Sequence, residues 1–444
     1  MERIAEWIWN PLLSLVYLEI GLLFLVVTAA FAWRHAGRVL AGGFRSTAET
    51  GPVGTRSISH REAFFSALAV SVGVGNLAGV ATAIHLGGPG ALFWMWMSAL
   101  VGMTYRMCST YLAIKYRPEP DSPLFGTPMA YLTRFLGSGP WRVIPTLFAA
   151  LVMIKGLVTA NLIQSNSVAH AIQEDVGLSH GIVALLLSGA VALVVVGGLR
   201  QILRVSVVIA PWMLGGYILI SLVLLISEPY QTVDALLLVF QYAFQPYALA
   251  GGVAGYTVLQ SIQFGISRGV FSHNSGMGVA PFLHAANTDH PAKGAMLAAL
   301  VPLFDTILIC TLTGLVILSS GHWLEYNGAF LTVSAFERVL GAGGRYAVSA
   351  CLVVFAFTTM INWAYFSERC FEFLGGRNLL AFRWIFVGVT FIGPFFPVKS
   401  LWSLADVLIG LMLILHLLPL TYIVLSRVPT MMRDLAHIPP DPQG

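Results

Sequence analysis

The stretch Gly73-Val74-Gly75-Asn76-Leu77-Ala78-Gly79 decides the interpretation of this chain, because it interrupts an apolar run from Arg61 to His85. Glycine inside a helix costs about 1 kcal/mol relative to alanine. Inside a bilayer, the backbone groups that a break frees find no partner in the hydrocarbon. Two explanations stay open. The Gly75-x-x-x-Gly79 spacing lets helices pack closely, or the break presents bare amides and carbonyls to a small polar ligand or an ion.

Composition places the chain in a membrane. It has 444 residues, of which 57% are hydrophobic and 10% are charged, whereas soluble domains carry about 25% charged residues. Apolar runs follow one another with short polar breaks, so we expect one polytopic membrane domain over residues 1–444 rather than several soluble domains. The four cysteines lie within apolar runs, which favours small buried hydrophobic residues over a disulfide or a metal site.

About eleven segments are long and apolar enough to be candidate spans, although a few are shorter than the usual length of about 20 residues. We therefore predict an all-α polytopic membrane protein. The predicted spans are Leu12–Trp33, Arg61–Leu86, Ala91–Tyr116, Val143–Ile172, Gly181–Gly198, Leu203–Ser227, Gly251–Phe271, Pro291–Ser319, Tyr346–Phe373, Leu379–Gly393 and Leu401–Leu425. The segment Thr232–Phe244 is too short and is expected to be an interfacial helix or a lid.

The placement of basic residues predicts the orientation. With the N-terminus outside and the C-terminus in the cytoplasm, about 18 of the 24 Lys and Arg residues fall on the cytoplasmic side, as the positive-inside rule requires. That count includes Arg268 as a residue of an inner loop. The expected location is the plasma membrane, most simply a bacterial inner membrane. Because the basic residues follow this rule, they do not indicate nucleic-acid binding.

The spans divide into an extra first span (12–33) and two sets of five. Repeat one covers 61–227 and repeat two covers 246–427. An odd number of spans in each repeat forces the two halves into opposite orientations, which predicts an inverted repeat with a binding site between interrupted spans. In the second repeat we favour a break at Gln263-Phe264-Gly265-Ile266-Ser267-Arg268-Gly269 over the alternative at Gly251–Gly255.

Three groups near mid-membrane are candidate ligands. Carbonyls just before the first break, from Ala69 to Val72, lose helical partners and suit a hard cation such as sodium. Thr358 and Thr359 offer two adjacent hydroxyls, although a threonine often bonds to its own preceding turn. Amides after Gly73 begin a new half-helix, whose positive end suits a carboxylate.

The span Val143–Ile172 carries a polar face with Asn161 and Gln164 and, two turns earlier, Lys155. The side-chain amides of Asn161 and Gln164 either form hydrogen bonds between helices or bind the substrate. A lysine at this depth indicates function. Asp305, Asp406 and His416 also lie in spans, where each is either a proton relay or a structural partner. The sequence shows no phosphate-binding loop, metal-ligand spacing or nucleophile with a base, so we do not expect an enzyme.

The sequence also resembles the alanine or glycine:cation symporter family (sodium:alanine symporters), from about Phe65 to Leu374. The tryptophan-rich motif is the most specific part of this resemblance. The motifs are Gly87-Gly88-Pro89-Gly90-Ala91-Leu92-Phe93-Trp94-Met95-Trp96-Met97-Ser98-Ala99-Leu100-Val101-Gly102, the run from Gly75 to Ala83, the run from Gly265 to Gly278, and Phe357-Thr358-Thr359 with Trp363.

This resemblance implies a leucine-transporter-like fold with five-plus-five inverted repeats, and sodium-driven import of a small neutral amino acid such as alanine or glycine by alternating access. Sodium is then the co-transported ion. The implied sodium ligands are Ala69, Val72, Thr358 and Thr359; the implied substrate-binding residues are Val74, Gly75 and Asn76 for the carboxylate, Gln164, Phe264 and Gly265 for the amino group, and Trp363 as a wall of the pocket.

Two departures from the family pattern bear on the substrate. The family usually has threonine where this chain has Val74, and it usually reads Ser-Asn-Glu-Ala-Gly where this chain has Ser272-His273-Asn274-Ser275-Gly276. A lost hydroxyl changes the discrimination between substrate analogues more than a lost methyl does, whereas the lost carboxylate at Asn274 is closer to the cytoplasmic end.

Rival functions stay open at this point. The same fold coupled to protons, through Asp305 or His416, is the nearest rival, and an amino-acid sensor or channel is a more distant one. The sequence alone does not name the amino acid, the ion stoichiometry or the oligomeric state.

Overall fold

The computed structural model describes residues 2–43, 59–119, 122–246, 257–285 and 291–436, and these residues form helices and no strand. The predicted all-α class is therefore confirmed. In chain order the helices are α1 (Glu2–Ile8), α2 (Pro11–Gly43), α3 (His60–Ser71), η1 (Gly75–Gly79), α4 (Val80–Gly87), α5 (Ala91–Lys115), α6 (Met129–Leu136), η2 (Gly139–Val143), α7 (Ile144–Val176), α8 (His180–Val195), α9 (Leu199–Ser227), α10 (Pro229–Tyr242), α11 (Val258–His273), α12 (Pro281–His284), α13 (Pro291–Pro302), η3 (Leu303–Cys310), α14 (Thr311–Ser320), α15 (Gly328–Phe373), α16 (Leu379–Ile392), η4 (Gly393–Phe395) and α17 (Val398–Ala436).

Length and composition identify membrane spans among these helices. Six helices in the described residues are long and apolar enough to cross a membrane, and the bent pair α3 and α4 adds a seventh if it is one span. The helices α8 and α16 are apolar but shorter. The predicted spans at Ala91–Tyr116 and Gly251–Phe271 are α5 and α11, whose polar side chains are mostly buried inside the bundle. Each predicted span thus overlaps a helix or a broken helix of the described residues, and positions 251–256 of the predicted span Gly251–Phe271 lie outside them.

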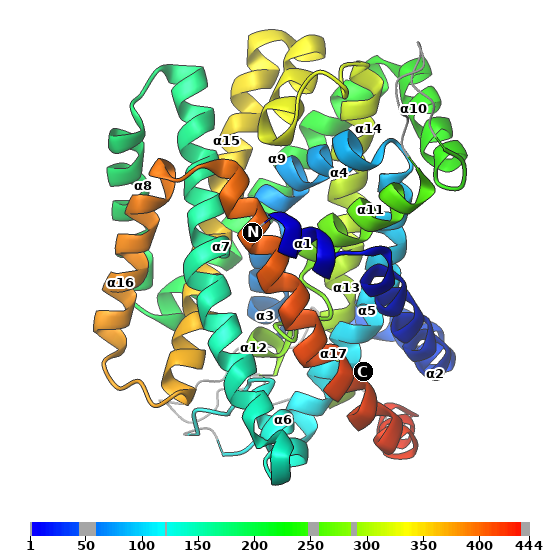
Figure 1. The fold of residues 1–444 in the computed structure, drawn as a ribbon, viewed down its shortest axis with the longest axis vertical. Helices are drawn as coiled ribbons and strands as arrows, with labels where there is room; N and C mark the ends of the chain where they lie inside the picture. The colour runs from blue at the N-terminus through cyan, green and yellow to red at the C-terminus, as the bar shows by residue number, and fades with distance from the viewer. Residues whose placement is uncertain (1, 44–58, 120–121, 247–256, 286–290, 437–444) are drawn as a thin grey trace.

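The helices form one bundle around α3, α5, α7, α11 and α15. Helix α15 packs on α7, α9 and α3, while α11 and α13 pack on α5. Figure 1 shows α8 and α16 together at one flank, α2 at the opposite flank, and α17 running across the front. The segment predicted to be an interfacial helix or lid is α10, which contacts α14 and carries exposed apolar side chains such as Leu237 and Phe240.

The first predicted break is confirmed. Helix α3 ends at Ser71, and Val72 is extended with φ −73° and ψ 102°. The chain then resumes as a single π-helical turn, η1, before α4. The two parts are bent by 51° relative to each other. Every residue from Val72 to Gly79 is buried, so this break lies within the bundle.

The second predicted break, at Gln263–Gly269, is wrong, because α11 runs unbroken through it. The glycines there allow close packing instead. A Cβ on Gly265 would overlap the carbonyl oxygen of Ala91 and lie 2.6 Å from the Cβ of Trp94. The helix ends later, at His273. The alternative break at Gly251–Gly255 lies outside the described residues.

The actual interruption of the second repeat begins at Asn274, which has the left-handed conformation φ 53°, ψ 23°. Asparagine tolerates this conformation better than most residues do. No regular helix forms from Asn274 to Ala280, and α12 follows. Both predicted repeats therefore begin with a helix that is interrupted. The boundaries of the repeats, 61–227 and 246–427, stay predictions.

Candidate functional site

The amides at the first break bind protein oxygens rather than helical carbonyls. The N–H of Gly73 donates to Oδ1 of Asn76 at 2.8 Å. The N–H of Val74 donates to Oε1 of Gln164, on α7, at 3.1 Å. In an unbroken helix, these two amides would bond to the carbonyls four residues earlier. The break therefore exchanges two helical hydrogen bonds for two hydrogen bonds with buried side-chain amides.

Two carbonyls at the unwound end of α3 face a hydroxyl on α15. The Oγ1 of Thr359 lies 3.5 Å from the carbonyl oxygen of Val70 and 3.4 Å from that of Val72. A Cβ on Gly73 would lie 2.5 Å from this Oγ1, so glycine is what allows the approach. We call the hydroxyl and these two carbonyls the Thr359 cluster. Oxygen ligands of this kind, on an unwound helix, suit a hard cation such as sodium.

Thr358 and Ala69, the other two predicted sodium ligands, are placed differently. The hydroxyl of Thr358 donates to the carbonyls of Val354 and Phe355 in its own helix, both at 3.1 Å. Thr358 therefore bonds to its own preceding turn, which is the alternative to ion binding that the sequence left open. The carbonyl of Ala69 has lost its helical partner, Gly73, but has no described contact with Thr359. Of the four predicted sodium ligands, the structure thus brings together Thr359 and Val72. It places a further carbonyl, that of Val70, beside them.

A second polar cluster lies on the other side of the break. The carboxylate of Asp305 accepts hydrogen bonds from Nδ2 of Asn76 at 2.8 Å and from the hydroxyls of Ser272 and Thr306, both at 2.7 Å. All four residues are buried. We call them the Asp305 cluster. Asn76 and Asp305 each lie in a π-helical turn, η1 and η3, and such turns are frequent at functional sites.

The sequence analysis gave Asp305 as either a proton relay or a structural partner, and it did not identify Ser272 and Thr306 as partners of its carboxylate. One signal was available. An aspartate in an apolar span needs a buried partner, and Asn76 was already placed in the neighbouring break.

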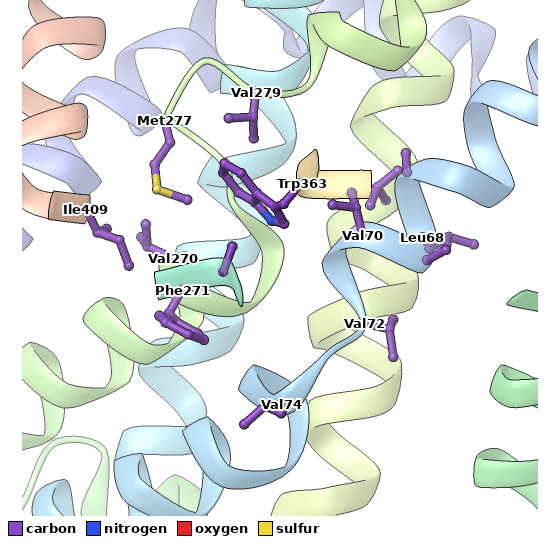
Figure 2. Close-up of a cluster of buried hydrophobic side chains, with 14 of the residues drawn as sticks. Leu68, Val70, Val72, Val74, Val270, Phe271, Met277, Val279, Trp363 and Ile409 are labelled. Carbon is purple, nitrogen blue, oxygen red and sulfur yellow. The ribbon is translucent and has the colours of Figure 1, made fainter. Parts of the chain in front are cut away.

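A small cavity lies between the first break and the helices α7, α11 and α15. Its volume is about 20 Å³, room for about one water molecule. The described conformation is therefore closed around the site. Figure 2 shows Trp363 between the unwound segment with Met277 and Val279 and the end of α3 at Val70. The lining residues are Val70, Ser71, Gly73, Gly75, Lys155, Thr159, Ala160, Gln164, Phe271, Asn274, Thr359 and Trp363.

Of the predicted substrate-binding residues, Gly75, Gln164 and Trp363 line this cavity. Asn76 is buried beside it, with its side-chain nitrogen turned to Asp305. Val74 contributes its amide to Gln164 but does not line the cavity.

Phe264 and Gly265 also lie away from the cavity. Phe264 is close to Gly87, where a Cβ would lie 3.1 Å from that of Phe264, and Gly265 packs on Ala91 and Trp94. Their predicted contact with the substrate depended on a break that is absent.

Two further predicted residues are engaged structurally. Arg268, expected in an inner loop, is buried in α11 and pairs with Asp406 at 2.6 Å. His416 contacts the carbonyl of Gly276 at 2.5 Å through Nδ1 and the hydroxyl of Tyr131 at 2.6 Å through Nε2. Because a carbonyl only accepts, Nδ1 carries the proton and Nε2 accepts from the tyrosine. His416 thereby anchors the unwound segment after α11.

Known proteins are similar to this chain in sequence, and others are similar to it in fold. A model of the sodium:alanine symporter family matches residues 1–436. The sodium/alanine symporter AgcS of Methanococcus maripaludis is 35% identical over 430 residues, which are 95% of this chain and 93% of that protein. The amino-acid carrier protein AlsT of Bacillus subtilis is 31% identical over 419 residues, or 93% and 87% of the two chains.

Among solved structures, MhsT in complex with L-phenylalanine is similar, with a TM-score of 0.60 at 12% identity, over 85% of this chain and 99% of that one. A Na+-coupled sialic acid symporter in a substrate-bound outward-open state has a TM-score of 0.50 at 13% identity, over 94% and 84%. The leucine-transporter-like fold is confirmed.

Proposed function

The chain belongs to the sodium:alanine symporter family, and from this premise we propose that it imports a small neutral amino acid, such as alanine or glycine, together with sodium. The family consists of membrane transporters rather than enzymes, and the apolar helices are those of a multi-pass membrane protein. We further propose a plasma-membrane location with the N-terminus outside and the C-terminus in the cytoplasm, in keeping with the basic residues.

The observation that carries the proposal is the Thr359 cluster. It joins the unwound end of α3 to α15, two elements that an ion at this point would hold together. In the proposed mechanism, sodium binds the hydroxyl of Thr359 and the carbonyls of Val70 and Val72, with Ala69 and Thr358 as neighbouring candidate ligands. Because sodium then steadies the broken span, it favours the outward-open state, and the bound substrate permits closure.

The cavity supports a small substrate. A Cβ on Gly75 would lie 2.8 Å from the ring of Phe271, and Trp363 forms another wall. Gln164 supplies a polar contact beside the break. A site with glycine on one side and aromatic rings on the other leaves little room for a side chain, which agrees with alanine or glycine.

Uptake by the purified protein in proteoliposomes tests the proposal. We expect labelled alanine to accumulate under an inward sodium gradient and to stay at background when potassium replaces sodium at equal ionic strength. Unlabelled glycine and other amino acids, added as competitors, define the substrate range. Accumulation without sodium, driven by a pH gradient alone, contradicts sodium coupling.

A proton-coupled transporter is the second candidate, and the Asp305 cluster is the observation that favours it. A buried carboxylate bonded to the broken span is placed to link protonation to the movement of that span. If protons drive transport, Asp305→Asn removes the dependence on the pH gradient. If sodium drives transport, this variant leaves the requirement for sodium in place. An ion current without substrate would favour a channel.

A further inference from the structure

Phe271 is the aromatic wall of the cavity that touches the broken span. It lies on α11 and lines the cavity together with Trp363. A Cβ on Gly75 would lie 2.8 Å from Cδ1 of Phe271 and 3.2 Å from its Cε1, so the ring packs directly on the backbone of the break. The position of this ring therefore sets how much of the cavity is left for the side chain of a substrate.

A second aromatic side chain, Trp402 on α17, supports this wall from outside the cavity. The centroids of the Phe271 and Trp402 rings lie 4.8 Å apart, and the ring planes are inclined at 37°. This separation is that of two aromatic rings in contact. Trp402 does not line the cavity. The ring of Phe271 thus contacts the backbone at Gly75 and the indole of Trp402, and only the second contact is made by a side chain.

An ion pair fixes Trp402 in turn. The Cζ of Arg268 lies 5.0 Å from the centroid of the Trp402 ring, close enough for a cation–π contact. The same guanidinium donates to the carboxylate of Asp406 at 2.6 Å. Arg268 and Phe271 are three residues apart on α11, and Trp402 and Asp406 are four apart on α17, so the members of each pair share a helix face. These four side chains link α11 to α17 beside the cavity.

From these contacts we propose that Trp402 is a positioning residue that limits the size of the substrate. It holds the ring of Phe271 against the break and thereby excludes larger aliphatic amino acids such as valine and leucine. This role of Trp402 rests on the proposed function and adds to it a residue outside the cavity that restricts the substrate. Because the closed cavity has a volume of only about 20 Å³, a small movement of the ring changes the available space by a large proportion.

The two aromatic walls differ in their freedom to move. Trp363 is 1% exposed, and the ammonium of Lys155 lies 3.6 Å from the centroid of its ring, so it is enclosed within the bundle. Trp402, behind the other wall, is only half-buried. A smaller side chain at this position would give the ring of Phe271 room to move away from Gly75, without leaving a closed void in the core.

Competition experiments in proteoliposomes test this role. The full-length protein takes up labelled alanine under an inward sodium gradient, with unlabelled glycine, valine and leucine as competitors. We expect valine and leucine to compete weakly, because an apolar pocket rejects a change of one methylene about 10- to 200-fold. Trp402→Leu should improve their competition relative to that of glycine about tenfold, and change the half-saturating alanine concentration less than about threefold. Trp402→Phe keeps a ring against Phe271 and should retain most of the discrimination.

Trp384→Leu is the matched control. It makes the same exchange on α16, which lies at the flank of the bundle away from α11 (Figure 1), and the Trp384 side chain is 54% exposed. We expect normal alanine uptake and normal discrimination. If Trp402 only stabilised the fold, Trp402→Leu would lower the melting temperature and the uptake of alanine while the competition ratios stayed as they are in the unaltered protein.

A double-mutant cycle tests whether Trp402 acts through Phe271. Phe271→Leu removes the ring and should by itself admit valine and leucine. In that background, Trp402→Leu should change the competition ratios less than about twofold. If Trp402→Leu does not fold, Trp402→Met takes its place, because its longer side chain fills more of the space, and the same direction of change is expected.

Two results overturn this role of Trp402 alone. The first is a folded Trp402→Leu protein, or Trp402→Met in its place, whose competition ratios equal those of the unaltered protein. The second is an equal change of these ratios with and without the ring of Phe271. Failure of the unaltered protein to take up either alanine or glycine with sodium would instead overturn the proposed function, and the role of Trp402 with it.

Discussion

The two glycine-rich stretches at Gly73–Gly79 and Gln263–Gly269 are alike in sequence and opposite in structure. At the first, the chain leaves the helix at Val72. At the second, α11 continues without interruption. In both, a missing Cβ lets another group come close. At Gly73 that group is the hydroxyl of Thr359, and at Gly265 it is the backbone and side chain of α5. The identity of the approaching group therefore separates a site from a packing contact.

The difference has a physical cause in the neighbouring polar groups. A helix breaks inside a bundle only if the freed amides find new acceptors. Asn76 and Gln164 supply these acceptors at the first stretch. We find no comparable side-chain acceptor for the amides of α11 in the described structure, so its helical hydrogen bonds persist. The chain unwinds later, at Asn274, whose left-handed conformation ends the helix.

The largest effect is expected from Gly73→Ala. The added methyl would lie 2.5 Å from Oγ1 of Thr359 and push this hydroxyl away from the two carbonyls. We expect sodium-dependent alanine uptake to fall about 100-fold or more, a change of about 3 kcal/mol, while the protein still folds. Uptake in proteoliposomes and a melting curve measure the two properties.

Gly79→Ala is the matched control for this change, because Gly79 lies at the end of the π-helical turn that follows Gly73, and a Cβ there has no neighbour within 4 Å. It should keep normal uptake. Equal loss of uptake in both variants would mean that flexibility of the turn, and not the approach of Thr359, is what matters.

Gly265→Ala tests the other half of the comparison. Its methyl would overlap the rigid carbonyl of Ala91, and overpacking of this kind typically lowers stability by about 1–3 kcal/mol. We therefore expect a lower melting temperature and less folded protein. The folded fraction should keep its half-saturating sodium concentration, because Gly265 is remote from the Thr359 cluster. A shifted sodium dependence without loss of stability would contradict the packing role.

Gly215→Ala controls for the substitution itself. It adds a methyl to α9 where no atom lies within 4 Å, so we expect unchanged or slightly higher stability.

A smaller effect is expected from removing single hydroxyls on α15. Thr359→Val should raise the half-saturating sodium concentration about tenfold, since a lost ligand of this kind costs about 1.4 kcal/mol. Thr358→Val should raise it less than about threefold, because that hydroxyl bonds to its own helix. Sodium titrations of alanine uptake measure both. A larger effect at Thr358 would show that its side chain turns toward the ion when sodium binds.

This comparison also shows what the sequence could predict. Hydropathy located the spans because each long helix must present apolar side chains to lipid or to the core. The first break was predictable, since Asn76 lies among its glycines. The second was misplaced because the glycines of α11 serve packing against residues more than a hundred positions away. Long-range contacts of this kind leave no local pattern.

The site was predicted in part for the same reason. Gln164, Gly75 and Thr359 could be named from polar or small residues at mid-membrane depth, and Trp363 could be named from the family resemblance; all four line the cavity. The partners of Asp305 could not be named. Ser272 and Thr306 are ordinary residues in a sequence, and only the meeting of η1, α11 and η3 makes them donors to one carboxylate.

Val74→Thr is expected to have the smallest effect, although Val74 lies within the decisive stretch and departs from the family pattern. The side chain is fully buried but does not line the cavity, so a hydroxyl there would not meet the substrate. We expect the ratio of alanine to glycine uptake to change less than about threefold. A buried hydroxyl without a partner costs about 1–3 kcal/mol, so stability should fall more than selectivity does. A large change in selectivity would instead show that Val74 reaches the substrate in an open conformation. The first glycine stretch would then set the substrate through a side chain as well as through its backbone.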